Sequence, residues 1–163
     1  MDLKKYIRSI PDYPKKGILF RDITTLIKDE NAFAETINQI VERSKKYNFN
    51  KVAAIESRGF VFASAVSYIL KKPFIMLRKK NKLPADVHSI DFELEYGTAT
   101  IEVHKDSIDQ KDTVLIIDDL IATGGTAEAA AKLIEISGGK VAAFIFVINL
   151  FDLGGSDNLV KNN

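Results

Sequence analysis

The chain has 163 residues, of which 46% are hydrophobic and 28% are charged, a composition typical of a single soluble globular domain with a sizeable core. Its 23 Lys and Arg residues nearly balance its 22 Asp and Glu residues, so no overall basic excess indicates a nucleic-acid partner. The chain has no cysteine, which excludes disulfides, thiol nucleophiles and cysteine-ligated metal centres.

The N-terminal part of the chain predicts an irregular segment followed by alternating helix and strand. Two prolines mark an N-terminal hood within residues 1–30. Apolar residues spaced three and four apart predict an amphipathic helix over 31–47. A short apolar run predicts a strand at 52–55, the polar residues 56–59 a turn, and the largely apolar residues 60–70 a second helix.

The middle of the chain predicts a strand, a loop and a flap. Residues 74–77 form another apolar run of strand length, whereas the basic residues 78–85 lack apolar periodicity and predict a mobile loop. Apolar and polar residues alternate over 90–96 and again over 101–103, on either side of a glycine. This alternation predicts a half-exposed antiparallel pair of strands.

The C-terminal part predicts a strand, a turn, a helix and a last strand. Residues 113–117 are apolar and lead directly into two adjacent carboxylates, 118–119. A turn is expected over 120–125 and an Ala-rich helix over 126–137. The last strand is predicted to be buried because it contains the longest apolar run of the chain, 141–148.

Neither a membrane span nor a secretion signal is expected. A helix that crosses a bilayer needs about 20 apolar residues, far more than the longest run here. The first six residues carry charges with no apolar run after them, unlike a signal peptide. We therefore expect a cytoplasmic protein with no membrane partner.

Two strand–helix–strand units predict an α/β domain in which helices flank a parallel sheet and an antiparallel flap projects from it. A single domain is expected over 1–163, with the hood at 1–30 and the flexible loop and flap at 78–104. Ligands of such sheets bind outside the carboxyl ends of the strands. The polar turns expected there are 56–59, 78–82 and 118–126.

The segment 114–130, VLIIDDLIATGGTAEAA, carries the strongest chemical signal. Glycines let backbone N–H groups approach a ligand closely, and the following helix N-terminus adds N–H donors and partial positive charge, which together favour a phosphate. Asp118 and Asp119 accept hydrogen bonds and prefer neighbouring hydroxyls. The segment therefore predicts a site for a ribose 5-phosphate. Neither a dinucleotide fingerprint nor a Walker loop fits its glycine pattern.

The segment 114–130 resembles the phosphoribosyl-pyrophosphate (PRPP) motif of the type I phosphoribosyltransferase family. Four further segments resemble the adenine-specific members of that family and occur in the same order: GILFRDIT at 17–24, IESRGF at 55–60, RK with KLP over 78–84, and EYG at 95–97. The resemblance extends from about residue 13 to residue 159. It implies the type I phosphoribosyltransferase fold and transfer of a 5-phosphoribosyl group from PRPP to adenine, which gives AMP and pyrophosphate.

The resemblance also implies roles for individual residues. The 5-phosphate would bind Ala122, Thr123, Gly124, Gly125 and Thr126, and the ribose hydroxyls would bind Asp118 and Asp119. The pyrophosphate would bind Arg58, Arg78, Lys79 and Lys82, with Arg78 able to reach a neighbouring subunit. Adenine would meet the backbone around Leu19 and Arg21 and the ring of Phe20, although an apolar run such as 18–20 alone favours a core position. Glu95 would handle the base proton. In the turn 56–59, the peptide before Ser57 is sometimes cis in related enzymes.

The family further implies Mg²⁺ brought by PRPP, with no direct protein ligand, and a homodimer. Family members commonly have glycines where Asn81 and Ala85 stand here, which changes the expected flexibility of the loop. Two alternatives remain open. One is a PRPP-sensing regulator of nucleic acid, against which the balanced charge argues; the other is an enzyme for another base, such as xanthine or uracil.

Overall fold

The computed structural model describes residues 1–94 and 96–162, and the chain forms two compact units, Met1–Arg43 and Ser44–Asn163. The predicted single-domain organisation over 1–163 stays a prediction. In the described residues, no helix combines the length and apolar character that crossing a membrane requires.

The first unit is built around a short antiparallel hairpin. Strand β1 pairs with β2 in a register that sets Arg8 opposite Asp22, and the side chains of these two residues form an ion pair. The loop between the strands contains a cis peptide bond at Tyr13–Pro14. The elements are η1 (Leu3–Tyr6), β1 (Arg8–Ile10), β2 (Phe20–Asp22), α1 (Thr24–Ile27) and α2 (Glu30–Ser44), the last ending at the boundary of the unit.

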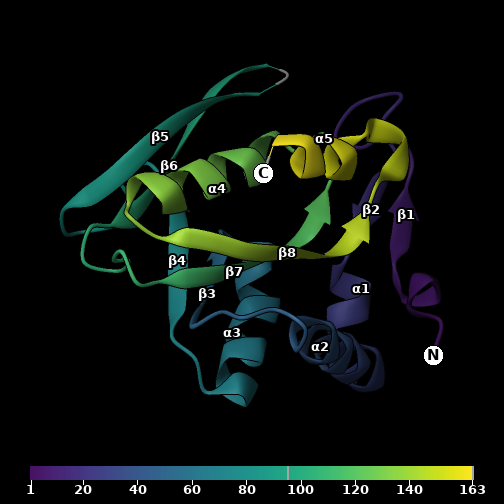
Figure 1. Cartoon of the computed structure of the whole chain (residues 1–163). Coiled ribbons are helices and arrows are strands. Elements are labelled where there is room, and N and C mark those ends of the chain that lie inside the picture. The colour runs from purple at the N-terminus through teal and green to yellow at the C-terminus, as the bar shows by residue number, and fades with distance from the viewer. Residues whose placement is uncertain (95, 163) are drawn as a thin grey trace. The chain divides into compact units, whose positions relative to one another are not determined.

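The second unit is an α/β structure around a six-stranded sheet of order β5-β6-β4-β3-β7-β8 (Figure 1). Strands β4, β3, β7 and β8 are parallel, and β5 and β6 are antiparallel. The elements are β3 (Lys51–Ile55), α3 (Arg58–Leu70), β4 (Phe74–Lys79), β5 (Val87–Leu94), β6 (Gly97–His104), β7 (Thr113–Ile121), α4 (Gly125–Ile136), β8 (Lys140–Asn149), η2 (Phe151–Leu153) and α5 (Gly155–Asn162). The predicted fold class, a parallel sheet flanked by helices with an antiparallel flap, is confirmed.

Helices cover both faces of this sheet, with α3 on one side and α4 on the other (Figure 1). On the α4 side, Leu133 and Ile134 belong to a buried cluster with side chains of β3, β4, β6 and β7. On the other side, α3 contacts β3 and β7 and buries Phe62 and Val66 completely. Burial on both faces explains why the central strands are continuous apolar runs in the sequence.

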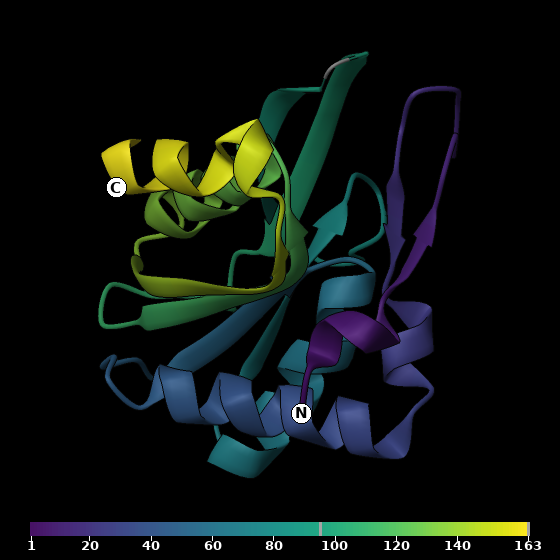
Figure 2. The ribbon, with the colours of Figure 1, turned by 90° about the vertical axis from the view of Figure 1, so that its right-hand side faces the viewer.

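The flap is part of the main sheet. Strand β6 pairs with β4 only at Arg78↔Glu102 and Lys79↔Ile101, so most of the β5–β6 hairpin extends past β4 (Figure 2). Arg78 and Lys79 were expected in a mobile loop, but this pairing keeps them in β4. Only the connection from residue 80 to 86 lies between the strands.

Two further differences at element boundaries concern the predicted polar turns 118–126 and 56–59. Strand β7 continues through both carboxylates to Ile121, because it pairs with β8 as far as Ile121↔Asn149. Helix α3 begins at Arg58, so Arg58 and Gly59 are helical and do not belong to the preceding turn.

Strand β8 was predicted to be buried, and this prediction is wrong. It lies at the edge of the sheet, where all residues from Val141 to Asn149 are half-buried. An apolar run indicates a strand but does not distinguish an edge strand from a central one.

Candidate functional site

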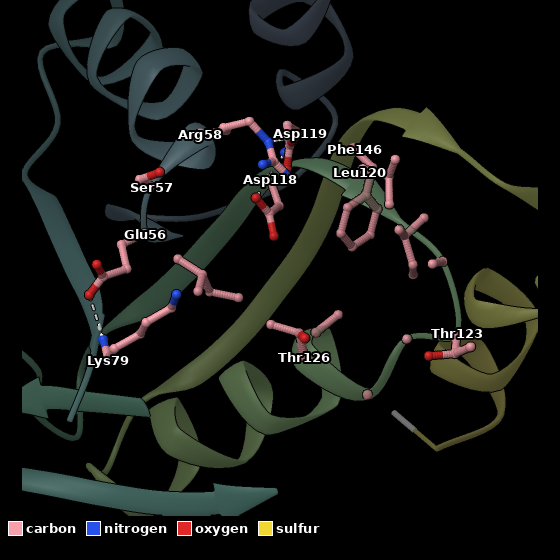
Figure 3. A pocket seen from close by; sticks show the side chains of 16 residues that line it. Glu56, Ser57, Arg58, Lys79, Asp118, Asp119, Leu120, Thr123, Thr126 and Phe146 are labelled. Carbon is pink, nitrogen blue, oxygen red and sulfur yellow. Dashed lines mark hydrogen bonds and ion pairs between the residues drawn. The ribbon is translucent and has the colours of Figure 1, made fainter. Parts of the chain in front are cut away.

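A pocket of about 360 Å³ lies where β3, β4 and β7 end, at the carboxyl edge of the parallel strands (Figure 3). All its residues belong to the second unit. They come from the end of β3 and the turn after it, the first residue of α3, the end of β4, the end of β7 and the turn after it, the start of α4 and one position on β8. The lining consists of Ile55, Glu56, Ser57, Arg58, Lys79, Asp118, Asp119, Leu120, Ile121, Ala122, Thr123, Gly124, Gly125, Thr126, Ala127 and Phe146.

The two adjacent carboxylates differ in their partners. Asp119 is buried, and its Oδ2 accepts a hydrogen bond from Arg58 Nε at 2.5 Å, in an ion pair that joins β7 to the start of α3. Asp118 Oδ1 instead accepts the backbone N–H of Asp119 at 2.9 Å. A cation therefore compensates Asp119 directly, whereas the backbone is the hydrogen-bond partner of Asp118.

This difference changes the protonation of Asp118. Burial, followed by the negative charge of Asp119, raises the pKa of Asp118 from 3.8 to about 8. The hydrogen bond from the Asp119 backbone and the more distant charge of Arg58 lower the pKa but do not offset the increase. Both carboxylates were predicted to act as acceptors only, but the raised pKa favours the neutral form of Asp118, which can also donate.

The turn between β7 and α4 has the geometry of an anion site. Gly124 precedes the first residue of α4 with φ +92°, a conformation that glycine adopts without strain. No side chain caps the helix at this residue. The N–H groups of the first helical turn have no acceptor within the helix, and Thr126 lies in that turn beside the cavity (Figure 3). The predicted phosphate turn therefore opens into the pocket.

Glu56 organises the cationic side of the pocket. Its Oε1 accepts the backbone N–H of Lys79 at 2.6 Å and lies 3.4 Å from Arg78 Nε. The peptide between Glu56 and Ser57 is cis, as the sequence resemblance implied. The side chain of Lys79 extends into the cavity (Figure 3). Glu56 thus fixes the end of β4 beside the turn that follows β3.

Nine of the residues predicted to bind PRPP meet in this one pocket, from Arg58 and Lys79 through Asp118 and Asp119 to the turn 122–126. Arg78 and Lys82 are not among the lining residues. Arg78 precedes Lys79 by one position on β4. Lys82 is an exposed residue of the 80–86 connection. Glu95 lies outside the described residues.

Seven residues of the pocket had no predicted role: Ile55, Glu56, Ser57, Leu120, Ile121, Ala127 and Phe146. Glu56 belongs to the IESRGF motif at 55–60, two positions before Arg58. Its place in this motif was the one feature of the sequence that could have indicated a role in the pocket. Leu120 and Phe146 were read as turn and core residues, because their contribution depends on the pairing of β7 with β8. No local pattern in the sequence distinguishes them.

The residues expected to recognise a base lie in the first unit. Leu19 is 49% exposed, which contradicts a core position. Phe20, at the start of β2, is half-buried and packs edge-to-face on Tyr13 with 5.1 Å between the ring centroids. Arg21 donates a hydrogen bond to the Ser9 hydroxyl across the hairpin.

The donor set of the pocket fits a metal ion that arrives with a ligand. Within residues 1–94 and 96–162, no group of three or more His, Cys, Asp or Glu side chains could hold a metal ion. Mg²⁺ commonly binds through one or two carboxylates together with substrate phosphates. Asp119, beside the phosphate turn, provides such a carboxylate.

Comparison with known proteins gives consistent results. Residues 23–158 match the phosphoribosyl transferase domain family. The adenine phosphoribosyltransferase of Pelagibacter ubique is 83% identical over 161 residues, covering 99% of this chain and 92% of that protein. The adenine phosphoribosyltransferase of Nitrosomonas eutropha is 54% identical over 159 residues, covering 98% and 91%.

Two solved structures are also similar. The crystal structure of adenine phosphoribosyltransferase from Thermoanaerobacter pseudethanolicus has a TM-score of 0.94 at 46% identity, covering 97% of this chain and 92% of that one. The enzyme from Saccharomyces cerevisiae, complexed with an imino-altritol bisphosphate and adenine, has a TM-score of 0.89 at 32% identity, covering 96% and 91%.

The raised pKa of Asp118 predicts a pH-dependent effect of Asp118→Asn. Between pH 3.8 and about 8 the folded protein binds a proton that the unfolded chain does not, so wild-type stability falls as pH rises through this range. Asparagine removes this dependence and keeps an acceptor for the Asp119 N–H. We expect the advantage of the variant over wild type in unfolding free energy to grow from pH 4 to pH 8 by at most about 6 kcal/mol, since each of the roughly four pKa units of the shift corresponds to about 1.4 kcal/mol.

Thermal unfolding of the protein without ligand, followed at pH 4, 6 and 8, measures this effect. Asp106→Asn makes the same chemical change at an exposed turn position and serves as the control. An advantage of Asp118→Asn that did not grow with pH, or that the control shared, would contradict the protonation of Asp118.

Proposed function

The chain belongs to the adenine phosphoribosyltransferases of the type I phosphoribosyltransferase family, and we propose that its pocket transfers the 5-phosphoribosyl group of PRPP to adenine, forming AMP and pyrophosphate. One observation of this structure carries the assignment of the pocket. An anion-binding turn, a carboxylate pair and two cations, which come from four segments of the chain, line a single cavity. The reaction is a step of purine salvage.

Each part of PRPP has a matching part of the pocket. The 5-phosphate binds the N–H groups and hydroxyls of the turn 122–126, where the start of α4 favours negative charge. The ribose hydroxyls bind Asp118 and Asp119. The pyrophosphate binds Arg58 and Lys79, on the opposite side of the carboxylates from the turn (Figure 3). Arg78 and Lys82 complete this charge from the end of β4 and the 80–86 connection.

The reaction breaks the bond between C1′ of the ribose and the pyrophosphate oxygen and forms a bond from C1′ to N9 of adenine, which loses its proton. Departure of pyrophosphate runs ahead of attack, so positive charge develops on the sugar. The chain contributes by positioning the reactants and stabilising charge, without a covalent intermediate. Arg58 and Lys79 hold the leaving group, and Asp118 and Asp119 hold the sugar.

Mg²⁺ belongs to this proposal as a partner of PRPP. It would be held by oxygens of PRPP, with the Asp119 carboxylate nearby and no direct protein ligand, and when bound it would neutralise charge on the leaving pyrophosphate.

Adenine recognition is assigned to the first unit. The similar yeast enzyme was crystallised with adenine. Adenine presents an N6 donor beside an N1 acceptor, a pair that the backbone around Leu19 and Arg21 can complement. The exposure of Leu19 and the partial exposure of Phe20 leave both side chains accessible to a ligand. A base stacked on Phe20 gains about 1–3 kcal/mol. Glu95 is proposed to accept the N9 proton.

We further propose a homodimer that forms through an apolar patch on α3 and β4, composed of Val61, Tyr68, Ile69 and Met76. Tyr68 is 85% exposed, and the other three side chains are between 37% and 48% exposed. Exposed apolar patches of this kind mark interaction sites. Arg78 lies two positions after Met76 on the same side of β4, with its Nε 3.4 Å from Glu56 Oε1. The family resemblance implies that this arginine reaches a neighbouring subunit, which favours a second copy of the chain as the partner of this surface.

We further propose that the protein acts in the cytoplasm and binds no nucleic acid. A PRPP-sensing regulator would share the fold and the PRPP pocket, so the distinction rests on the reaction itself.

The reaction is tested by incubating the protein with PRPP, Mg²⁺ and one base at a time, and separating the nucleotide products. We expect AMP from adenine and little product from hypoxanthine, guanine, xanthine or uracil. Folded protein that forms no AMP, or that retards nucleic acid in a gel-shift assay instead, would contradict the proposal.

Arg58→Ala tests the pyrophosphate side of the pocket. Loss of one charged hydrogen bond costs roughly 1.5–3 kcal/mol, so we expect pyrophosphate to bind about 10- to 100-fold more weakly. The adenine KM should change little. Calorimetric titration with pyrophosphate and steady-state kinetics measure both effects. Lys132→Ala removes an exposed cation from α4, outside the pocket, and should leave both values unchanged; equal pyrophosphate affinity in Arg58→Ala and wild type would remove Arg58 from the site.

Tyr68→Glu tests the dimer. A charge at the most exposed residue of the patch should shift the protein to the monomer, because burying an unpaired carboxylate opposes association. Size-exclusion chromatography with light scattering should give twice the chain mass for wild type and the single mass for the variant. Val160→Glu adds the same charge to an exposed apolar residue of α5 and should remain dimeric. A monomeric wild type would refute the proposed dimer.

A further inference from the structure

The C-terminal segment lies directly behind the phosphate turn. The backbone N–H of Gly155, the first residue of α5, donates to the carbonyl oxygen of Ala122 at 3.0 Å. A Cβ atom on Gly155 would lie 2.3 Å from this oxygen and 2.8 Å from the backbone N of Gly124. A Cβ on Gly124 would in turn lie 2.9 Å from the Gly155 carbonyl oxygen. The two backbones therefore touch with no room for a side chain on either.

The same segment is anchored at both ends of the turn. Leu159 of α5 is buried in a small cluster with Ile121, the last residue of β7, and Ala127, in the first turn of α4. The N–H of Leu150 donates to the Ile121 carbonyl oxygen at 3.0 Å. These contacts lie immediately before and after residues 122–126. Helix α5 thus contacts the turn through Gly155 and packs Leu159 on the residues immediately before and after it.

The adjacent glycine provides a contrast. Gly154 has φ +71°, but a Cβ there would have no neighbour within 4 Å. A side chain at Gly154 costs backbone strain only, whereas one at Gly155 must displace the turn itself. The two positions separate a general loss of stability from a displacement of the phosphate turn.

We propose that Gly155 is a positioning residue for the 5-phosphate of PRPP, and that α5 supports the 122–126 turn from behind. The inference rests on the proposed function of this turn. Gly155 does not line the pocket and acts only through the backbone of Ala122 and Gly124. Its effect is therefore specific for the part of the ligand that the turn binds.

Gly155→Ala tests this role, with Gly154→Ala as the matched control. A displacement of the turn of up to 1 Å should raise the KM for PRPP by about 10- to 100-fold. The KM for adenine should stay within about twofold of the wild-type value, because the variant does not change the first unit, where adenine is proposed to bind. Gly154→Ala should lower the melting temperature while both KM values stay near wild type.

Ligand-induced shifts in melting temperature provide a readout that a purely structural role would not move. Ribose 5-phosphate and pyrophosphate are added separately to each variant. In Gly155→Ala, stabilisation by ribose 5-phosphate should be largely lost and stabilisation by pyrophosphate retained. Leu159→Ala, which loosens α5 without a clash, should show the same pattern more weakly and serves if Gly155→Ala does not fold.

The outcomes separate the two levels of the proposal. Wild type that ribose 5-phosphate does not stabilise would overturn the assigned site, and the role of Gly155 with it. Wild type that is stabilised, together with Gly155→Ala and Leu159→Ala variants that respond equally to ribose 5-phosphate, would overturn the role of Gly155 alone. Equal loss of both ligand responses would show only general damage and would also contradict it.

Discussion

Two neighbouring parallel strands, β3 and β7, end at the same edge of the sheet, and the pocket depends on this adjacency. Their register sets Ala54 opposite Ile117, so the chain leaves β3 at the level where Asp118 begins the polar end of β7. The turn after β3 therefore lies against the carboxylates, and Arg58 reaches Asp119 across 61 positions of sequence. Without this pairing, the cations and the phosphate turn would not line the same cavity.

Charge inside the pocket is arranged by this geometry, although the chain as a whole carries a formal charge of only +1. Arg58 compensates Asp119, and burial beside Asp119 raises the pKa of Asp118 to about 8, which favours its neutral form. A polyanionic ligand thus meets two cations and the N-terminus of α4, with less repulsion than two ionised carboxylates would cause. Adjacent residues of the same type acquire different states because only one has a cationic partner.

Much of this arrangement could be predicted from the sequence, because its signals are local. Apolar runs located β3 and β7, and the chemistry of the 114–130 segment located the phosphate turn. Features that depend on tertiary pairing could not be predicted. The extension of β7 through Asp118 and Asp119, the half-exposed position of β8 and the place of Phe146 in the pocket all follow from the β7–β8 pairing. The contact of Gly155 with Ala122 likewise joins residues that no local pattern relates.

The long separation in sequence between Arg58 and Asp119 also determines when the pocket can form during synthesis. Parallel pairing of β3 with β7 encloses α3, β4 and the β5–β6 hairpin, so this contact closes a loop of high contact order. During synthesis, the turn after β3 leaves the ribosome long before its partners in β7 and α4. The cavity can therefore form only after the C-terminal half has emerged, because a shorter nascent chain lacks the carboxylates and the phosphate turn.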